Sequence, residues 1–379
     1  MPRVGPRIVR VVHNGYMPCL EGSFFALAFY DVAEQIQAEK LREILGATQP
    51  HRAPSFKHPA PEYVRFQVPP VIEYPEPVSL PSGEKFESRI KYFDYGVVCV
   101  ELEMSFATDW DGLVRLSSRW IGEPQLETTS GDLLRSRLDR IRGAMVQPYS
   151  SWLTEDYYVI QVTRAPDGSG DPLTAKALLA SCRDKIAQIV RGETAALSDT
   201  EREEVLQSSV SYYPNDLLIA GWTAAFLYDT PESAIPTRQL LEYANTQLLE
   251  FRHYDEVLTQ VLANVYRALE HKRGFFAGWK MGRQAEHLNA MRLEVSELTE
   301  RADNSIKFLS DMFYSRAYRM VSNRVGVADY RLLVEEKLKT AGELYNAMVE
   351  EFRQSRAFIL EAMVVAILVI ELIQAFRHG

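Results

Sequence analysis

The sequence predicts an α+β protein: a mixed α/β N-terminal domain, then long coiled-coil-like helices, then an apolar C-terminal helix of transmembrane length. Three observations predict this fold class. Strand-length apolar runs alternate with segments of helical periodicity up to residue 229. From Thr237 onward proline is nearly absent and apolar residues recur every three or four positions. Residues 357–376 then form a single apolar stretch.

The composition limits the classes of function. A chain of 379 residues is long enough for two domains. Its net charge of -9 argues against a broad phosphate-binding surface, which needs clustered lysine and arginine. Cys19, Cys99 and Cys182 lie far apart without the spacing of metal ligands, as expected in a reducing compartment. The N-terminus lacks the apolar core of a secretory signal.

We expect residues 1–229 to form the α+β head domain. The apolar run from Phe24 to Ala33 predicts a strand, and the helical pattern after it ends at Gly46. Residues 50–81 are proline-dense and predict an extended surface connector. Further strands are predicted at 91–104, at 156–162 and on either side of Pro214-Asn215-Asp216, and further helices at 109–122 and 173–192.

Residues 230–356 are predicted to form long helices with a coiled-coil seam. The first stripe comprises Leu241, Ala244, Leu248, Phe251, Asp255, Leu258, Leu262, Val265 and Leu269. Asp255 is polar at a core position, where it would fix the register or lie at a solvated edge. A glycine-rich break at 273–282 separates this helix from one that ends near Gly326. The last helix continues without a breaker into the C-terminal apolar stretch.

That apolar stretch is predicted to be a transmembrane helix. Of the 20 residues from Ala357 to Phe376, 17 are apolar, and a helix of this length spans ~30 Å. Arginines gather before the span, which would keep the head on the cytoplasmic side of a bacterial inner membrane, or of the mitochondrial inner membrane in a eukaryote. Glu361 and Glu371 leave a second interpretation open, a buried seam between subunits of a homo-oligomer.

The same stretch carries a family resemblance. The pair Leu360-Glu361, followed by an aliphatic block and Glu371, resembles the C-terminal signature of the Rmd1/Sif2/Sif3 family, or DUF155, which includes RMND1. The chain is similar to a divergent, bacterial member, with Arg356 where the family has histidine. Two upstream segments also resemble the family: a strand with Tyr92, Phe93, Asp94 and Gly96, and a segment around Asp311.

The resemblance implies a membrane-anchored homo-oligomer with an α/β head. It also implies a non-enzymatic role, since the mitochondrial members support translation at the inner membrane by tethering ribosomes. Our main hypothesis is therefore a non-enzymatic, membrane-anchored homo-oligomeric scaffold. The alternatives are a soluble oligomer that binds RNA or ribosomes and an unrecognised metal-dependent hydrolase.

No motif in the sequence predicts catalytic, cofactor-binding or metal-ligating residues. Glu250 and His253 form an E-x-x-H pair, but di-iron bundles need two such pairs and two more glutamates. A basic, aromatic segment is a candidate contact for an anionic partner such as RNA, although a solvated hairpin tip is the favoured interpretation. Its cationic residues are Lys272, Arg273, Lys280 and Arg283.

Overall fold

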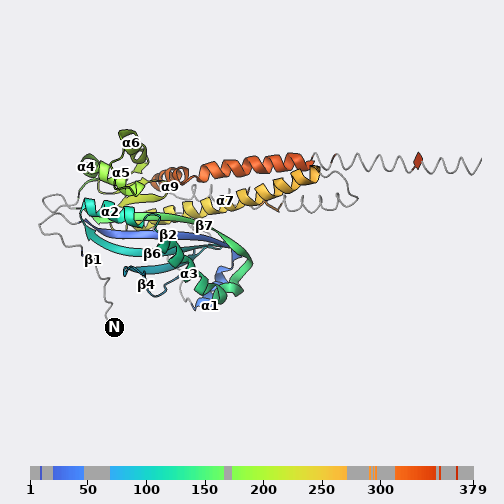
Figure 1. The fold of residues 1–379 in the computed structure, drawn as a ribbon, viewed down its shortest axis with the longest axis horizontal. Coiled ribbons are helices and arrows are strands. Elements are labelled where there is room, and N and C mark those ends of the chain that lie inside the picture. The colour runs from blue at the N-terminus through green and yellow to red at the C-terminus, as the bar shows by residue number, and fades with distance from the viewer. Residues whose placement is uncertain are drawn as a thin grey trace, which may run out of the picture. The chain divides into compact units, whose positions relative to one another are not determined.

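We describe the protein from a computed structural model of the full chain (Figure 1). The structure describes residues 9–10, 20–46, 69–165, 173–270, 290–291, 293, 295–296, 312–346, 350 and 364–365. The chain divides into two compact units, each of which is built from two segments. The first unit is Met1–Glu250 with Arg301–Asp329, and the second is Phe251–Glu300 with Tyr330–Gly379.

A mixed β-sheet forms the centre of the first unit. Its long central strands are β2 (Leu20–Ile36), β6 (Val97–Thr108) and β7 (Met145–Arg164), and β2 pairs antiparallel with both neighbours. Among the described residues the sheet order is β3-β5-β6-β2-β7-β10-β9-β8 (Figure 1). The shorter strands are β1 (Val9–Arg10), β3 (Val71–Glu73), β4 (Val78–Ser79), β5 (Lys85–Tyr92), β8 (Ser209–Val210), β9 (Leu217–Ala220) and β10 (Ala224–Tyr228).

One parallel pairing determines where several helices lie. β10 runs parallel to β7, with Phe226 opposite Ile160, so the chain between them must cross over. That crossover carries α4 (Ala175–Ser181), α5 (Arg183–Arg191) and α6 (Asp199–Gln207). The other helices in the described part of the first half of the chain are α1 (Ala38–Leu45), α2 (Trp110–Trp120) and α3 (Pro124–Ile141), which is followed by the short 3-10 helix η2 (Arg142–Ala144).

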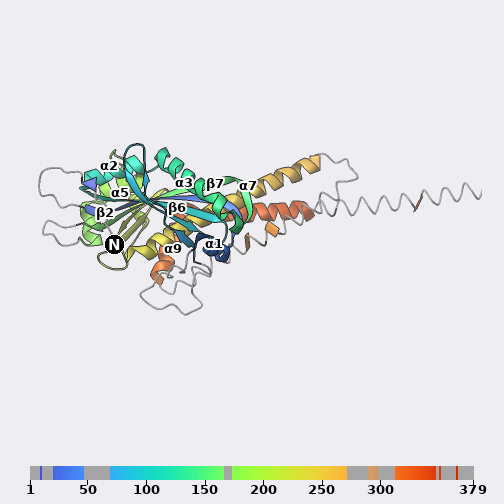
Figure 2. The same cartoon turned by 90° about the horizontal axis from the view of Figure 1, so that it is seen from below.

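These helices cover one face of the sheet. α2 packs on α5 at one end of the strands and α1 packs on α3 nearer the other end (Figures 1 and 2). Phe24 and Ile160 on this face and Leu134 and Ile186 on the helices share one core and are fully buried. A fully buried side chain of this kind contributes about 1.5–3 kcal/mol to folding.

The first part of helix α7 (Ala234–Glu270) and helix α9 (Met312–Val325) belong to the first unit and are buried against the opposite face. The Arg238 guanidinium lies 4.1 Å from the centre of the Phe25 ring, and Leu241 and Leu248 are buried. Because both faces of β2 are covered, Phe24 and Phe25 are both buried although they point to opposite faces. This explains why the sequence of the strand is a nearly continuous apolar run.

In the second unit, residues 251–270 of α7 pair with residues 330–346 of the helix over residues 327–346. Leu258, Val334 and Ala341 are fully buried along this hairpin. The ammonium of Lys337 lies 2.6 Å from Asp255 Oδ1 and 2.7 Å from Thr259 Oγ1. The polar position that interrupts the apolar stripe is therefore paired within the same chain.

The predicted strand over 91–104 is wrong in one respect. β5 ends at Tyr92 and β6 begins at Val97, and the residues between them form a tight turn. Gly96 has a φ of 94°, and a side chain there would meet the carbonyl oxygen of Ala33 at 1.7 Å. A glycine in this conformation reverses the chain inside an otherwise continuous apolar run.

The predicted transmembrane helix is also corrected. Among the residues that the structure describes, no helix is long and apolar enough to cross a membrane. The longest described helix, α7, carries charged residues along its length, including Glu242, Glu250 and Asp255. Residues 357–376 lie outside the described part except for Val364 and Val365. The predicted membrane and transmembrane character is therefore not supported, and the described residues form an α+β fold.

Candidate functional site: a buried charge cluster

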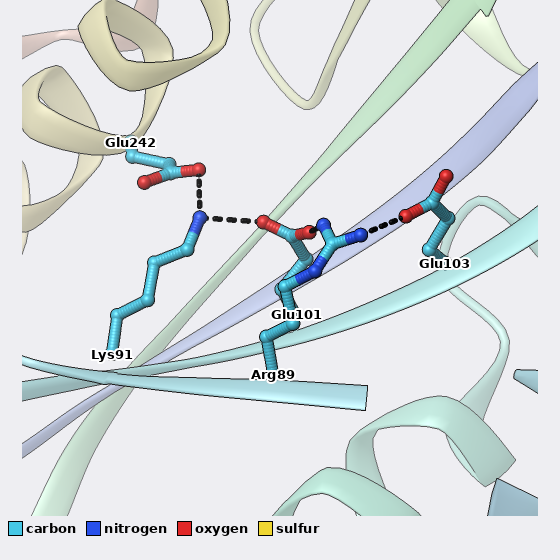
Figure 3. Close-up of polar contacts among 5 residues, drawn as sticks. All are labelled: Arg89, Lys91, Glu101, Glu103 and Glu242. Atoms are coloured by element: carbon cyan, nitrogen blue, oxygen red, sulfur yellow. Dashed lines mark hydrogen bonds and ion pairs between the residues drawn. The ribbon is translucent and has the colours of Figure 1, made fainter. Parts of the chain in front are cut away.

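Five charged side chains meet between the sheet and α7 in the first unit (Figure 3). Together they form what we call the charge cluster, and they are Arg89, Lys91, Glu101, Glu103 and Glu242. Charged residues are almost never buried unless they are paired. This cluster is therefore the least expected feature of the core and the first candidate for a functional site.

The strand register brings four of these residues to one face. Residues two apart on a strand share a face, so Arg89 and Lys91 lie together on β5, and Glu101 and Glu103 lie together on β6. Arg89 is directly opposite Glu101 in the antiparallel pair. Helix α7 adds the fifth member, Glu242, from above this face.

The contacts form one connected chain of ion pairs. Arg89 donates to Glu101 and, at 2.5 Å, to Glu103. Lys91 donates to Glu101 at 2.5 Å and also to Glu242. The Glu101 side chain is 2% exposed and that of Glu242 is 6% exposed, so these charges are screened little by solvent.

In this cluster, burial disfavours the charged form of each side chain, whereas pairing with an opposite charge favours it. The two effects therefore shift each pKa in opposite directions. Burial favours the neutral form of Glu101, but Lys91 and Arg89 outweigh it, so its pKa is lowered. Burial raises the pKa of Glu242, and the negative charge of Glu101 raises it further. The positive charge of Lys91 lowers this pKa, but by less than burial and Glu101 together raise it. Burial opposes the charged form of Lys91, yet both carboxylates together raise its pKa.

These properties fit a structural role better than a chemical one. A lysine acts as a nucleophile or general base when its pKa is lowered, whereas that of Lys91 is raised. Each charge is also held by another member of the cluster. The cluster therefore fastens the first part of α7 to the sheet, and the hydrogen bond of 2.8 Å between Tyr95 and Thr246 makes a second link.

The motif residues predicted from the sequence lie beside this cluster. Tyr92, Phe93, Asp94 and Gly96 form the end of β5 and the turn that follows it. Tyr92 is buried and donates a hydrogen bond of 2.9 Å to Glu73. The Asp94 carbonyl accepts a hydrogen bond from the Ile36 backbone N–H, which joins the turn to the end of β2. Their positions indicate a structural role in the hairpin.

The remaining predicted residues lie outside the described part of the chain. They are Asp311, Leu360, Glu361 and Glu371 from the family motif, and Lys272, Arg273, Lys280 and Arg283 from the basic segment. The contact of the basic segment with RNA or a ribosome therefore stays a prediction. Within the described residues, no three side chains of the His, Cys, Asp and Glu types come together to hold a metal ion.

Sequence reasoning missed the charge cluster itself. The signal was present, because Arg89 and Lys91 alternate with apolar residues, as do Glu101 and Glu103 in the next strand. Such alternation predicts charged faces turned to solvent on a half-exposed sheet. Only the position of Glu242, which is about 150 residues away along the chain, indicates that this face is covered.

Comparison with known proteins places the chain in a family. The family described as "Uncharacterized protein MJ0711, N-terminal domain" matches residues 21–234, which is more than half of the chain. The chain belongs to this family. The matched region of the MJ0711 family ends at the first residue of α7, so it contains the four strand residues of the charge cluster but not Glu242.

A relative from the same family is the uncharacterized protein MJ0711 of Methanocaldococcus jannaschii. It is 21% identical over 190 residues, which are 50% of this chain and 58% of that protein. The match thus spans little more than half of the relative's own length. No solved structure matches the chain. These findings do not test the resemblance to the Rmd1/Sif2/Sif3 family, which stays a prediction.

Proposed function

We propose that the protein is a homo-oligomeric scaffold that acts by binding rather than by catalysis. The observation that carries the proposal is an apolar surface on the second unit. Leu332 and Leu333 on the helix over residues 327–346 are 64% and 45% exposed. Two adjacent leucines exposed on a helix are candidates for burial against a second copy of the chain.

The helical geometry supports this surface as distinct from the intrachain seam. Val334 and Ala341 are seven residues apart, so they share the face that is buried within the unit. At ~100° per residue, Leu332 lies ~160° from Val334 around the helix. The helix therefore has one apolar face inside the unit and additional apolar side chains outside it, as helices in oligomeric bundles do.

The charge cluster supports the non-catalytic part of the proposal. Its ion pairs satisfy one another in the interior, and their arrangement holds α7 against the sheet. A head that is fixed in this way is suited to presenting a surface to a partner.

The native mass of the intact chain tests the proposal. We expect a multiple of 43.2 kDa for the wild type and a shift toward that monomer mass for Leu332→Glu with Leu333→Glu. Lys339→Glu on the same helix is the matched control, because it changes the net charge by the same amount without removing an apolar side chain. A wild-type monomer at micromolar concentration, or equal masses for the double variant and the wild type, would contradict the proposal.

A further inference from the structure

Helix α9 is joined to the rest of the first unit by a face that is half polar. Within the described side chains of α9, the buried ones are Ser315, Ala317, Tyr318, Val321, Ser322 and Val325. The three polar residues of this set recur at spacings of three and four, so they form one stripe along the helix. The apolar residues are only alanine and valine, which remove less surface from water than leucine or phenylalanine would.

The polar stripe contacts α7 and is only partly hydrogen-bonded. The Tyr318 hydroxyl donates a hydrogen bond to Gln247 Oε1, and the ring centres of Tyr318 and Tyr243 are 5.9 Å apart. Among the described residues, Gln247 Nε2 and Ser322 Oγ have no hydrogen-bond partner, although both residues are buried. A buried polar group without a partner disfavours the packed arrangement, because water would satisfy it. Release of α9 would hydrate both groups.

The C-terminal end of α9 is held by an ion pair that reaches solvent. Arg324 donates hydrogen bonds of 2.5 Å and 2.6 Å to the Glu204 carboxylate and one of 2.9 Å to the Glu204 carbonyl oxygen. The side chains of Arg324 and Glu204 are 22% and 44% exposed. Salt therefore weakens this attachment.

A glycine ends α9 and can act as a hinge. Gly326 has a φ of 91° and separates α9 from the helix over residues 327–346. Glycine adopts this conformation readily, and hinges are a few residues at the ends of elements. A side chain at Gly326 would meet the Trp222 ring at 3.2 Å, and Trp222 is 54% exposed. The helix can therefore change direction at this position.

The strand that α9 contacts has an apolar surface. α9 packs on β9, and Leu217 and Ile219 of β9 belong to the core on the face that α1 to α6 cover. Leu218 and Ala220 alternate with them and so point to the opposite face, where both are buried. Release of α9 would uncover these two residues.

We propose that α9 is a strap that releases from the first unit by local opening while the sheet stays folded. The unsatisfied groups of its polar stripe lower the free energy that release requires. The Arg324–Glu204 pair makes release sensitive to salt, and Gly326 supplies the hinge. This strap is distinct from the surface of Leu332 and Leu333, so α9 can release whether or not the chain is oligomeric.

Hydrogen exchange of the intact protein, followed by mass spectrometry, tests the strap. Local opening exposes little surface, so exchange in α9 should respond weakly to dilute urea, whereas exchange in β6 should respond steeply. We expect α9 to exchange faster than β6, and faster still as salt is raised. Equal rates and equal urea dependence in α9 and β6 would overturn the proposal, as would α9 amides that exchange without any protection.

One variant should fasten the strap. Ser322→Ala removes a buried hydroxyl that has no partner among the described residues, and it should slow exchange in α9 about fivefold or more. Asn323→Ala is the matched control, because it gains similar helix propensity at an exposed position of the same helix. The control should slow exchange less, and equal effects of the two variants would overturn the proposal.

A second variant should loosen the strap. Arg324→Gln should accelerate exchange in α9 about threefold and leave β6 unchanged. Arg119→Gln is its control, since it removes the partly exposed ion pair of 2.5 Å between α2 and Glu84 and should leave α9 unchanged. An unchanged rate in α9 of the Arg324→Gln variant would also overturn the proposal.

Discussion

Lys91 is the residue on which the charge cluster depends, because it joins a carboxylate of the sheet to a carboxylate of α7. Replacement by methionine leaves Glu101 and Glu242 buried without their shared cation. We expect Lys91→Met to lower the free energy of unfolding by about 3–5 kcal/mol. Urea unfolding of the intact chain measures this.

Lys85→Met is the matched control, since Lys85 lies on the same strand but is exposed. It should change the free energy of unfolding by less than about 0.5 kcal/mol. Similar losses in the two variants would mean that the chain of ion pairs does not stabilise the fold.

Glu242 and Glu101 make the stability depend on pH in opposite ways. Because the folded-state pKa of Glu242 is raised, its proton stabilises the fold at low pH. That contribution is lost as pH rises from the unfolded pKa of about 4.3 through the raised value. Glu101 has a lowered pKa, so its contribution is present above about pH 4.3 and is lost as pH falls below it.

Glu242→Gln separates the two effects. The stability of the wild type relative to this variant should decrease as the pH is raised above 4.3, which is the approximate ordinary pKa of glutamate. Urea midpoints of both proteins across this pH range provide the measurement. A difference that grows with pH would mean that Glu242 is stabilised as the carboxylate.

Alanine substitutions at Gly96 and Gly46 distinguish the cost of backbone strain from the cost of steric overlap. Both have positive φ, but a side chain at Gly46 meets nothing within 4 Å, whereas one at Gly96 meets the Ala33 carbonyl oxygen at 1.7 Å. We expect Gly46→Ala to cost about 1–2 kcal/mol. Gly96→Ala should cost clearly more, because β2 and the turn must separate. Thermal unfolding of both variants tests this order, and equal losses would contradict it.

Some of these residue-scale features could be predicted from the sequence and others could not. The sequence identified Asp255 as a polar position in an apolar stripe. It predicted one strand over 91–104, however, and so did not indicate the turn at Gly96. The pairing of Lys91 with Glu242 could not be predicted, because helix and strand periodicity show which face a residue is on but not what covers that face.

At the scale of elements, the ion pair of Asp255 and Lys337 connects the two helices of the second unit. The Lys337 ammonium contacts both Asp255 and Thr259, which lie one turn apart on α7. The side chains of Asp255 and Lys337 are 22% and 27% exposed, so this ion pair is only partly screened by solvent. A polar pair at a core position favours one register over its neighbours.

A double-mutant cycle tests this pair. We expect Asp255→Ala and Lys337→Ala to show a coupling energy of about 0.5–1 kcal/mol. The same cycle on Arg331 and Glu335, an ion pair within one helix at 3.0 Å, should give a smaller value. A coupling near zero for Asp255 and Lys337 would mean that the apolar seam alone sets the register.

The elements differ in how clearly the sequence predicts them. The run from Phe24 to Ala33 is apolar at every position but one, so the central part of β2 is evident. Helix α3 was not predicted, because it buries small residues such as Ser130 and Gly131 and is polar along much of its length. The transmembrane helix was predicted from length and hydropathy alone, and the described helices do not support it.

At the scale of the whole molecule, the thiols report on unfolding. Cys99 is fully buried and burial raises its pKa, whereas Cys182 is partly exposed. In a variant with Cys19→Ser, we expect a thiol reagent to modify Cys182 quickly and Cys99 only when the first unit unfolds. Peptide mapping after timed labelling measures both rates. Equal rates at the two cysteines in native conditions would contradict the burial of Cys99.

The order of the strands has a consequence for the behaviour of the protein at high concentration. Within the described sheet, β2 is paired with β6 on one side and with β7 on the other, whereas the outermost strands β3 and β8 have three and two residues. A short outer strand presents few unpaired backbone groups to a second molecule. The ordering thus shields both edges of the apolar strand β2 from pairing with a second molecule.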